Sequence, residues 1–170
     1  MVKWREETAI NAEIKTVWAL FLDRNMKKIF PKLEDHVLVE GKDDEAGAKH
    51  AQSFLQGSQL MTYVVETLAF EDTPERKQRT TSFLMNGSIS VVYSFTLEKL
   101  EGGKTRFIYA GSNKGVTASA KMMLLAGSKK VRQETIRGFM ERVSKEAMKL
   151  QEKGEGSISV KGEPRNDRME

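Results

Sequence analysis

The chain has 170 residues, of which 31% are charged and 39% hydrophobic, and its formal net charge is +4. This composition is typical of one globular domain with its own core, and so small a charge gives no reason to expect a nucleic-acid partner. The absence of cysteine excludes disulfides, thiolate metal sites and a thiol nucleophile, and no apolar run reaches the ~18 residues of a membrane span. Because no apolar segment follows Met1, we expect no secretory signal and a cytoplasmic protein.

The first predicted elements are a strand and two short helices. Residues 2–10 alternate in the manner of an opening strand. After Asn11, a residue that favours helix starts, apolar residues recur at helical spacing from Ala12 to Leu22. A second helical segment, Asn25 to Phe30, ends at Pro31, because proline interrupts a helix.

Six further strands are predicted in quick succession, separated by short polar turns. Their ranges are His36–Gly41, Ala48–Leu55, Gln59–Phe70, Lys77–Met85, Ser88–Leu100 and Thr105–Asn113. The dipeptide Asn86-Gly87 is typical of a tight hairpin. Because parallel neighbours would need helical crossovers, we expect these strands to pair as an antiparallel meander.

The last large element is a predicted helix from Gly115 to Lys153. Its apolar residues between Val131 and Leu150 share one face, which can cover the apolar face of the sheet. The methionine-rich segment from Val116 to Gly127 is out of phase with that face. Two interpretations stay open: a bend at Gly127 makes this segment a flap over a cavity mouth, or Gly127 lets the backbone approach the sheet closely.

One domain and a tail are predicted. All the patterned segments lie within residues 1–153, which contain no internal repeat. Residues 154–170 are polar and glycine-rich, which predicts a flexible tail. We expect the protein to be a monomer.

Basic residues concentrate on the predicted C-terminal helix. From Lys114 to Lys153 there are ten Lys or Arg and four Asp or Glu. A solvated outer face with ion pairs between residues four apart explains this surplus. The alternative is a weak attraction to an anionic membrane or an acidic partner.

Four places in this order match a known layout. They are the start of the chain (Thr8–Ala12 with Val17, Trp18 and Phe21), the segment from Tyr63 through the Glu71–Arg76 turn, the Glu98–Thr105 hairpin and the C-terminal helix. On these grounds the chain resembles the SRPBCC superfamily over about residues 2–150. That superfamily includes START domains, birch-pollen-allergen-type proteins and bacterial polyketide cyclase/dehydrase-like proteins.

The resemblance implies an α+β helix-grip fold. In that fold a curved antiparallel sheet of about six to seven strands wraps around a long C-terminal helix, with two short helices after the first strand. It also implies an apolar cavity between sheet and helix that holds lipids, sterols, flavonoid-like or polyketide molecules.

Ten residues are candidates to line such a cavity, because they lie on apolar strand faces or on the C-terminal helix. They are Tyr63, Met85, Tyr93, Phe95, Phe107, Tyr109, Met122, Leu125, Phe139 and Met140. The register of Tyr63 is not fixed, because its strand is apolar on both faces. Ordinary core packing explains the same residues, so both interpretations stay open at this point.

Residues able to carry chemistry are scarce. His36 and His50 are the only histidines, and neither has a His or Cys partner at metal-binding spacing. We interpret them as ordinary strand residues, with a general base at His50 as the alternative. The run from Asp43 to Glu45 lacks the spacing of an EF-hand, and no phosphate loop or nucleophile elbow stands out. We therefore predict no metal, no cofactor and no catalytic residue.

Three functions follow from these observations. The first is binding of a small apolar ligand, lipid-like, aromatic or polyketide-like, between sheet and C-terminal helix. The second is a cyclase/dehydrase-like enzyme that uses the same cavity, in which a tyrosine or His50 moves a proton. The third is a module that docks on a membrane or an acidic partner through the basic helix face. The scarcity of catalytic groups favours the first.

Overall fold

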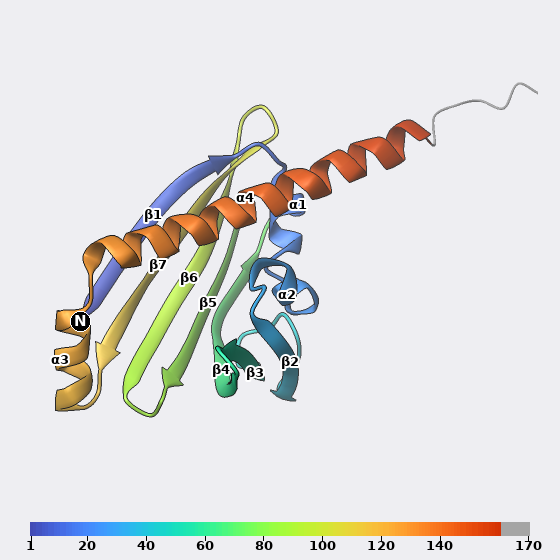
Figure 1. The fold of residues 1–170 in the computed structure, drawn as a ribbon. Coiled ribbons are helices and arrows are strands. Elements are labelled where there is room, and N and C mark those ends of the chain that lie inside the picture. The colour runs from blue at the N-terminus through green and yellow to red at the C-terminus, as the bar shows by residue number, and fades with distance from the viewer. Residues whose placement is uncertain (161–170) are drawn as a thin grey trace, which may run out of the picture.

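A computed structural model describes the backbone of residues 1–160 and the side chains of residues 1–154. The elements in chain order are β1 (Val2–Ile10), α1 (Ile14–Ala19), η1 (Asp23–Asn25), α2 (Met26–Ile29), β2 (Leu33–Glu40), β3 (Lys49–Gln56), β4 (Gln59–Asp72), β5 (Arg76–Met85), β6 (Ile89–Leu100), β7 (Lys104–Gly115), α3 (Ala118–Ala126) and α4 (Lys129–Val160). Figure 1 shows α4 crossing one face of a curved sheet, with α1 and α2 beside it.

The seven strands form one antiparallel sheet in the order β1-β7-β6-β5-β4-β3-β2. Strands β2 to β7 make the predicted meander, and β1 joins its end by pairing with β7 along its whole length. The turn between β5 and β6 has positive φ at both Asn86 (50°) and Gly87 (64°), as an Asn-Gly hairpin requires. The predicted fold class, a helix-grip arrangement of sheet and C-terminal helix, is confirmed.

The C-terminal part consists of two helices, as the phase slip at Gly127 predicts. Gly127 follows the last residue of α3 with φ −67° and ψ 143°, a conformation open to any residue, and it is exposed. The alternative in which Gly127 approaches the sheet is therefore wrong. Ser128 precedes the first residue of α4, and its side chain accepts a hydrogen bond from the backbone N–H of Val131 at 3.4 Å.

The close approach occurs at Gly115 instead. A Cβ placed on Gly115 would lie 2.5 Å from the backbone nitrogen of Lys121, so only glycine lets α3 sit against the end of β7. Helix α4 continues to Val160, seven residues beyond the predicted end at Lys153. The rest of the predicted tail, residues 161–170, lies outside the described residues.

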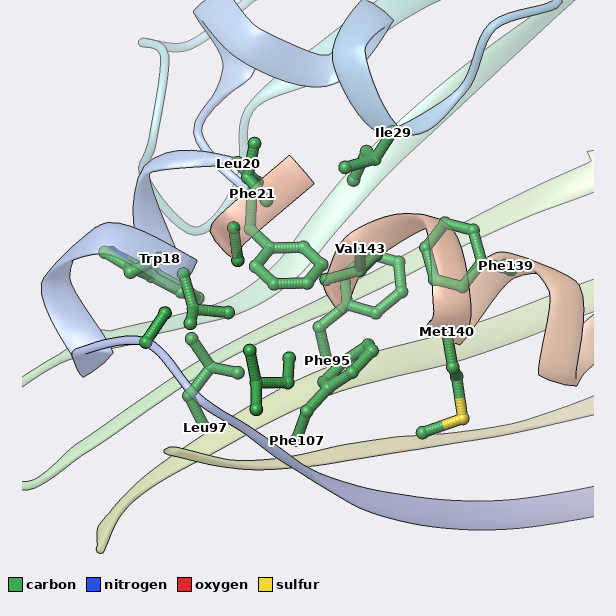
Figure 2. Packing of buried hydrophobic residues seen from close by; sticks show 14 of the residues in the cluster. Trp18, Leu20, Phe21, Ile29, Phe95, Leu97, Phe107, Phe139, Met140 and Val143 are labelled. Atoms are coloured by element: carbon green, nitrogen blue, oxygen red, sulfur yellow. The ribbon is translucent and has the colours of Figure 1, made fainter. Parts of the chain in front are cut away.

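The core lies between the sheet, α1 and the middle of α4. In Figure 2, Phe139, Met140 and Val143 of α4 face Phe95 and Phe107 of the sheet. All five are buried, and together with side chains from α1 and α2 they form one apolar cluster. The grip of α4 on the sheet therefore rests on apolar burial, worth about 1.5–3 kcal/mol for each large side chain. Among the described residues, no helix is long and apolar enough to cross a membrane.

Candidate functional site

A cavity of about 290 Å³ lies on the inner face of the sheet. Its lining comes from β1, from β3 to β7 and from the residue after α2. Seven of the lining residues are aromatic (Trp4, Phe30, Phe54, Tyr63, Phe83, Tyr93 and Tyr109), three are apolar (Val65, Met85 and Val91) and two are amides (Gln52 and Asn113). The cavity is therefore apolar with few polar groups, as small-molecule sites usually are.

The strand register explains how the aromatic wall forms. Gly111 of β7 pairs with Trp4 on one side and with Tyr93 on the other. A Cβ on Gly111 would lie 2.3 Å from Cζ2 of Trp4, so the indole occupies the space that any other residue would fill. Trp4 meets Tyr109 edge-on, with ring centroids 5.7 Å apart, and Tyr109 meets Tyr93 edge-on at 6.4 Å.

Two buried polar atoms of this lining have no hydrogen-bond partner among the described residues. They are Nε1 of Trp4, a donor, and Oδ1 of Asn113, an acceptor. An unpaired buried polar atom costs about 1–3 kcal/mol, so native proteins nearly always supply a partner. Both residues also line the cavity, so a water or ligand inside it is a candidate partner once either side chain turns toward it.

The two tyrosines on the inner sheet face are held in the neutral form. Burial raises the pKa of Tyr93, and the positive charge of Arg79 and a hydrogen bond with Thr81 offset only part of the rise. Burial, and the neighbouring Tyr93, raise the pKa of Tyr109 far above its ordinary value. At neutral pH both phenols can therefore donate a hydrogen bond, and neither is a strong base.

These shifts predict a loss of stability in alkali. A tyrosine whose pKa is higher in the folded state stabilises the fold below the unfolded pKa of about 10, and this contribution disappears as pH rises above it. We expect the free energy of unfolding to fall from about pH 10 upward, and less steeply in the variant Y93F/Y109F. Urea unfolding at several pH values, with tyrosinate absorbance as a second probe, measures both effects. An equal alkaline loss in the variant and the natural chain would contradict the prediction.

The structure places the ten predicted site residues in three groups. Tyr63, Met85, Tyr93 and Tyr109 line the cavity. Phe95, Phe107, Phe139 and Met140 lie in the core beside it, where the rings of Phe95 and Phe139 contact Tyr109 at 5.3 and 5.0 Å. Met122 and Leu125 are exposed on α3 and do not line this cavity.

Strand alternation could have found more of the lining. Phe83 and Val91 share the face of Met85 and Tyr93, since residues two apart point to the same side of a strand. Trp4 lies in the first strand, where more and less exposed residues alternate and Trp4 takes one of the less exposed positions. Phe30 and Gln52 have no such signal, because their places depend on how α2 and β3 fold over the sheet.

A second group of polar side chains comes together in the fold, and no pattern in the sequence predicts it. Asp23, His36, His50 and Arg79 come from η1, β2, β3 and β5 and form a buried charged cluster. Oδ1 of Asp23 accepts a hydrogen bond from Nη2 of Arg79 at 2.6 Å and lies 2.7 Å from Nε2 of His36. Its other oxygen accepts a hydrogen bond from the backbone N–H of Asp44 at 2.7 Å, and Oδ1 of Asp44 accepts one from the backbone N–H of Asp23 at 2.8 Å.

The charges of this cluster depend on one another. Burial alone would raise the pKa of Asp23, but the hydrogen bond with His36 and the charge of Arg79 hold it well below its usual range. Burial and the nearby Asp23 charge raise the pKa of Asp44, although it accepts a backbone hydrogen bond. Asp23 is therefore an anion fixed by its partners rather than a proton carrier.

The same cluster brings three potential metal ligands together. Ligand atoms of Asp23, His36 and His50 lie within 4.8 Å of one another. However, the two imidazole rings stack at 4.2 Å with planes only 8° apart, so their in-plane lone pairs do not converge on one point. The carboxylate also already pairs with Arg79. In this arrangement the cluster is a hydrogen-bonded network rather than a metal centre.

His50 does not reach the cavity. Its Nε2 lies 2.7 Å from Oδ1 of Asp43 on the protein surface, and its buried side chain is not among the residues that line the cavity. The charged cluster contacts the cavity lining through Gln52, a lining residue whose Nε2 lies 2.9 Å from Nδ1 of His36. The alternative role of His50 as a general base in the cavity therefore has no geometric support.

A larger hollow of about 660 Å³ lies at the opposite end of the sheet, between the start of α1 and two hairpin turns. Its lining includes Lys15, Lys77, Lys99 and Lys104, and Lys77 is paired with Asp72. Charged side chains dominate it, so it suits water better than an apolar ligand. We therefore take the smaller aromatic cavity as the candidate site.

No protein-family model matches the chain, and no curated protein matches its sequence. Among solved structures, it is similar to a hypothetical protein of Helicobacter pylori, with a TM-score of 0.67, 13% identity and 88% of each chain covered. It is also similar to Ara h 8.0201, with a TM-score of 0.61, 15% identity and coverage of 87% of this chain and 98% of that one.

A third similar structure is norcoclaurine synthase from Thalictrum flavum in complex with dopamine and hydroxybenzaldehyde. Its TM-score is 0.60 at 10% identity, with 87% of each chain covered. At such identities the likeness shows the fold alone. The chain thus has the helix-grip fold that these solved structures share.

Proposed function

We propose that the protein binds a small hydroxylated aromatic molecule in the cavity of the inner sheet face. The observation that carries this proposal is a largely aromatic lining that includes two buried polar atoms with no partner among the described residues. A volume of about 290 Å³ is at the small end for ligand sites and suits one or two rings rather than a sterol.

The polar atoms define what the ligand must offer. Nε1 of Trp4 can donate to a ligand oxygen, and Oδ1 of Asn113 can accept from a ligand hydroxyl. Tyr93 and Tyr109 present aromatic rings for edge-on packing. A phenol offers a ring, an acceptor and a donor in one molecule, which a plain alkane chain does not.

The similar structures support the class of ligand by analogy. The Thalictrum enzyme holds dopamine and hydroxybenzaldehyde, both small aromatics with hydroxyl groups. Fold alone does not determine function, so the proposal rests on the lining of this chain and takes the analogy as support.

Binding is a better proposal than catalysis for this cavity. No carboxylate, amine, guanidinium or imidazole is among its described lining residues. Tyr93 and Tyr109 are held neutral, and the two histidines belong to the charged cluster, outside the cavity lining. General acid–base catalysis needs a group that exchanges its proton near neutral pH and touches the substrate.

The experiment is a ligand titration with 2-naphthol, 4-hydroxybenzaldehyde, laurate and a sterol, followed by amide NMR shifts. We expect the two phenols to shift residues of the cavity. The variants W4F and N113L should each weaken binding by about 3–10-fold, the effect of one lost hydrogen bond.

A matched control is available in Trp18. Its Nε1 is also buried and has no partner in the described part of the chain, but Trp18 is not among the residues that line the cavity. The variant W18F should leave phenol binding unchanged. No shift with any probe, or an equal loss of affinity in W18F, would overturn the proposal.

A further inference from the structure

Helix α3 presents large apolar side chains to water. Met122, Met123 and Leu125 are 72%, 59% and 82% exposed. On the inner side of the helix, Ala120 is buried and Leu124 is half-buried against the sheet. The nine-residue helix carries one charge, Lys121, so it is apolar on its outer side as well as its inner side. A surface helix normally turns a polar face to solvent, and such exposed patches mark interaction sites.

The surroundings of α3 are positively charged. Residues 102–133 contain no Asp or Glu. Lys114, Lys121, Lys129 and Lys130 are all exposed, and of these Lys130 lies 3.9 Å from the exposed Glu134. We call Met122, Met123, Leu125 and these four lysines the α3 surface.

The start of the chain extends the α3 surface. Figure 1 shows the N-terminus beside α3. Met1 and Lys3 share a shallow groove with Lys129 and Arg132, and Met1 is 68% exposed. Another apolar side chain and another lysine therefore lie at the same end of the molecule, although Glu6 adds one acidic group to that groove.

We propose that the α3 surface docks the protein on anionic membranes, with α3 lying in the headgroup region. An anionic membrane offers both an apolar acyl boundary and negatively charged phosphates. The methionines and the leucine can enter the acyl boundary, while the lysines around them contact lipid phosphates. Each lysine near an anionic surface strengthens binding by a factor of about five. The attraction is charge-dependent and reversible.

Charge also argues against a second copy of this chain as the occupant. In a two-fold symmetric dimer the same surface meets itself, so the lysines of one copy would face those of the other. Like charges facing each other disfavour that contact. An anionic lipid surface has the opposite sign, and it also accepts apolar side chains.

Helix α3 packs next to one end of the cavity, so docking of α3 would affect that end. Leu124 and Ala120 pack against a cluster that includes Phe83, Met85 and Tyr93, all three of which line the cavity. A docked α3 would bring this end of the cavity to the bilayer. That consequence rests on the proposed function, whereas the docking itself does not.

Vesicle co-sedimentation of the full chain tests the docking. Vesicles of phosphatidylcholine alone are compared with vesicles that contain about 30 mol% phosphatidylglycerol, at low and high salt. We expect at least about a tenfold higher bound fraction with the anionic lipid, and loss of this excess in high salt. The variants M122S/M123S/L125S and K121E/K129E/K130E should each lose most of the binding.

Matched controls change similar residues elsewhere. V37S/V39S replaces two exposed apolar residues of β2, and K27E/K28E replaces two exposed lysines of α2. Both should bind anionic vesicles like the natural chain. Circular dichroism verifies that all variants fold, which their exposed positions favour.

Three outcomes would overturn the docking proposal. They are equal binding to neutral and anionic vesicles, unchanged binding in both α3 variants, and a concentration-dependent dimer that disappears in M122S/M123S/L125S. Phenol binding without vesicles is measured on the same variants and should not change. A failure of docking is thereby distinguished from a failure of the cavity proposal.

Discussion

Replacing Arg79 with methionine is expected to lower the free energy of unfolding by about 3–5 kcal/mol. Arg79 is buried, and its guanidinium donates to Asp23, to the carbonyl of Phe21 at 2.9 Å and to the hydroxyl of Thr67 at 3.1 Å. Methionine fills much of the same space but leaves the Asp23 carboxylate buried without its cation. A buried charge that loses its partner costs far more than the pair contributes.

The charge argument is tested with a second substitution. The double variant D23N/R79M removes both charges, so it should be less destabilised than the sum of D23N and R79M. Urea unfolding of the four proteins gives the coupling free energy between the two sites. A coupling near zero would contradict the prediction.

The matched control for Arg79 is Arg106. It pairs with Glu98 at 3.9 Å on the surface, where both side chains are more than a third exposed. The variant R106M should change the free energy of unfolding by less than about 1 kcal/mol, as exposed ion pairs usually do. If R79M cost no more than R106M, the charged cluster would not stabilise the fold.

The cluster has a definite place in the architecture. Reciprocal hydrogen bonds between Asp23 and Asp44 fasten the turn after β2 to η1, and Arg79 connects both to the middle of the sheet. Helix α2 follows η1 directly and ends next to Phe30, which lines the cavity. The charged cluster therefore supports the cavity wall at Phe30, so its loss should also weaken ligand binding.

Local patterns account for most of the fold. Alternation predicts the strands because one face of the sheet is buried, and the Asn86-Gly87 turn predicts a hairpin because of its backbone geometry. The split of the C-terminal region at Gly127 is visible as a phase slip. The residue that seats α3, Gly115, is not visible, because its role depends on a contact between two elements.

Local patterns predict only some of the residues that line the candidate site, because the rest of the lining depends on contacts between elements. Alternation leads to Tyr93 and Tyr109, but it cannot tell which apolar residues surround a cavity and which fill the core next to it. On α3, apolar residues lie all round the helix, so periodicity does not show that Met122 and Leu125 face outward. The charged cluster has no sequence signal, since strand register places residues 36, 50 and 79 on the sheet and the packing of η1 brings Asp23 to them.

The second large effect is expected at Phe95, where core and cavity meet. Phe95 is 1% exposed, and its ring lies 4.6 Å from that of Phe21 on the core side and 5.3 Å from that of Tyr109 on the cavity side. The variant F95A should lower the free energy of unfolding by about 3–5 kcal/mol, through lost burial and the space left behind. Urea unfolding measures it.

The F95A variant also tests whether Phe95 belongs to the core or to the cavity wall. If only Tyr93 and Tyr109 separate it from the cavity, the two spaces should join in F95A, and 2-naphthol should raise the unfolding midpoint more than in the natural chain. The control is F83A, which removes a half-buried ring of the lining and should cost less stability because less apolar area is lost. An equal loss of free energy of unfolding in F95A and F83A would contradict the assignment of Phe95 to the core. Phe95 would then belong to the cavity lining, as its place on the apolar strand face predicts.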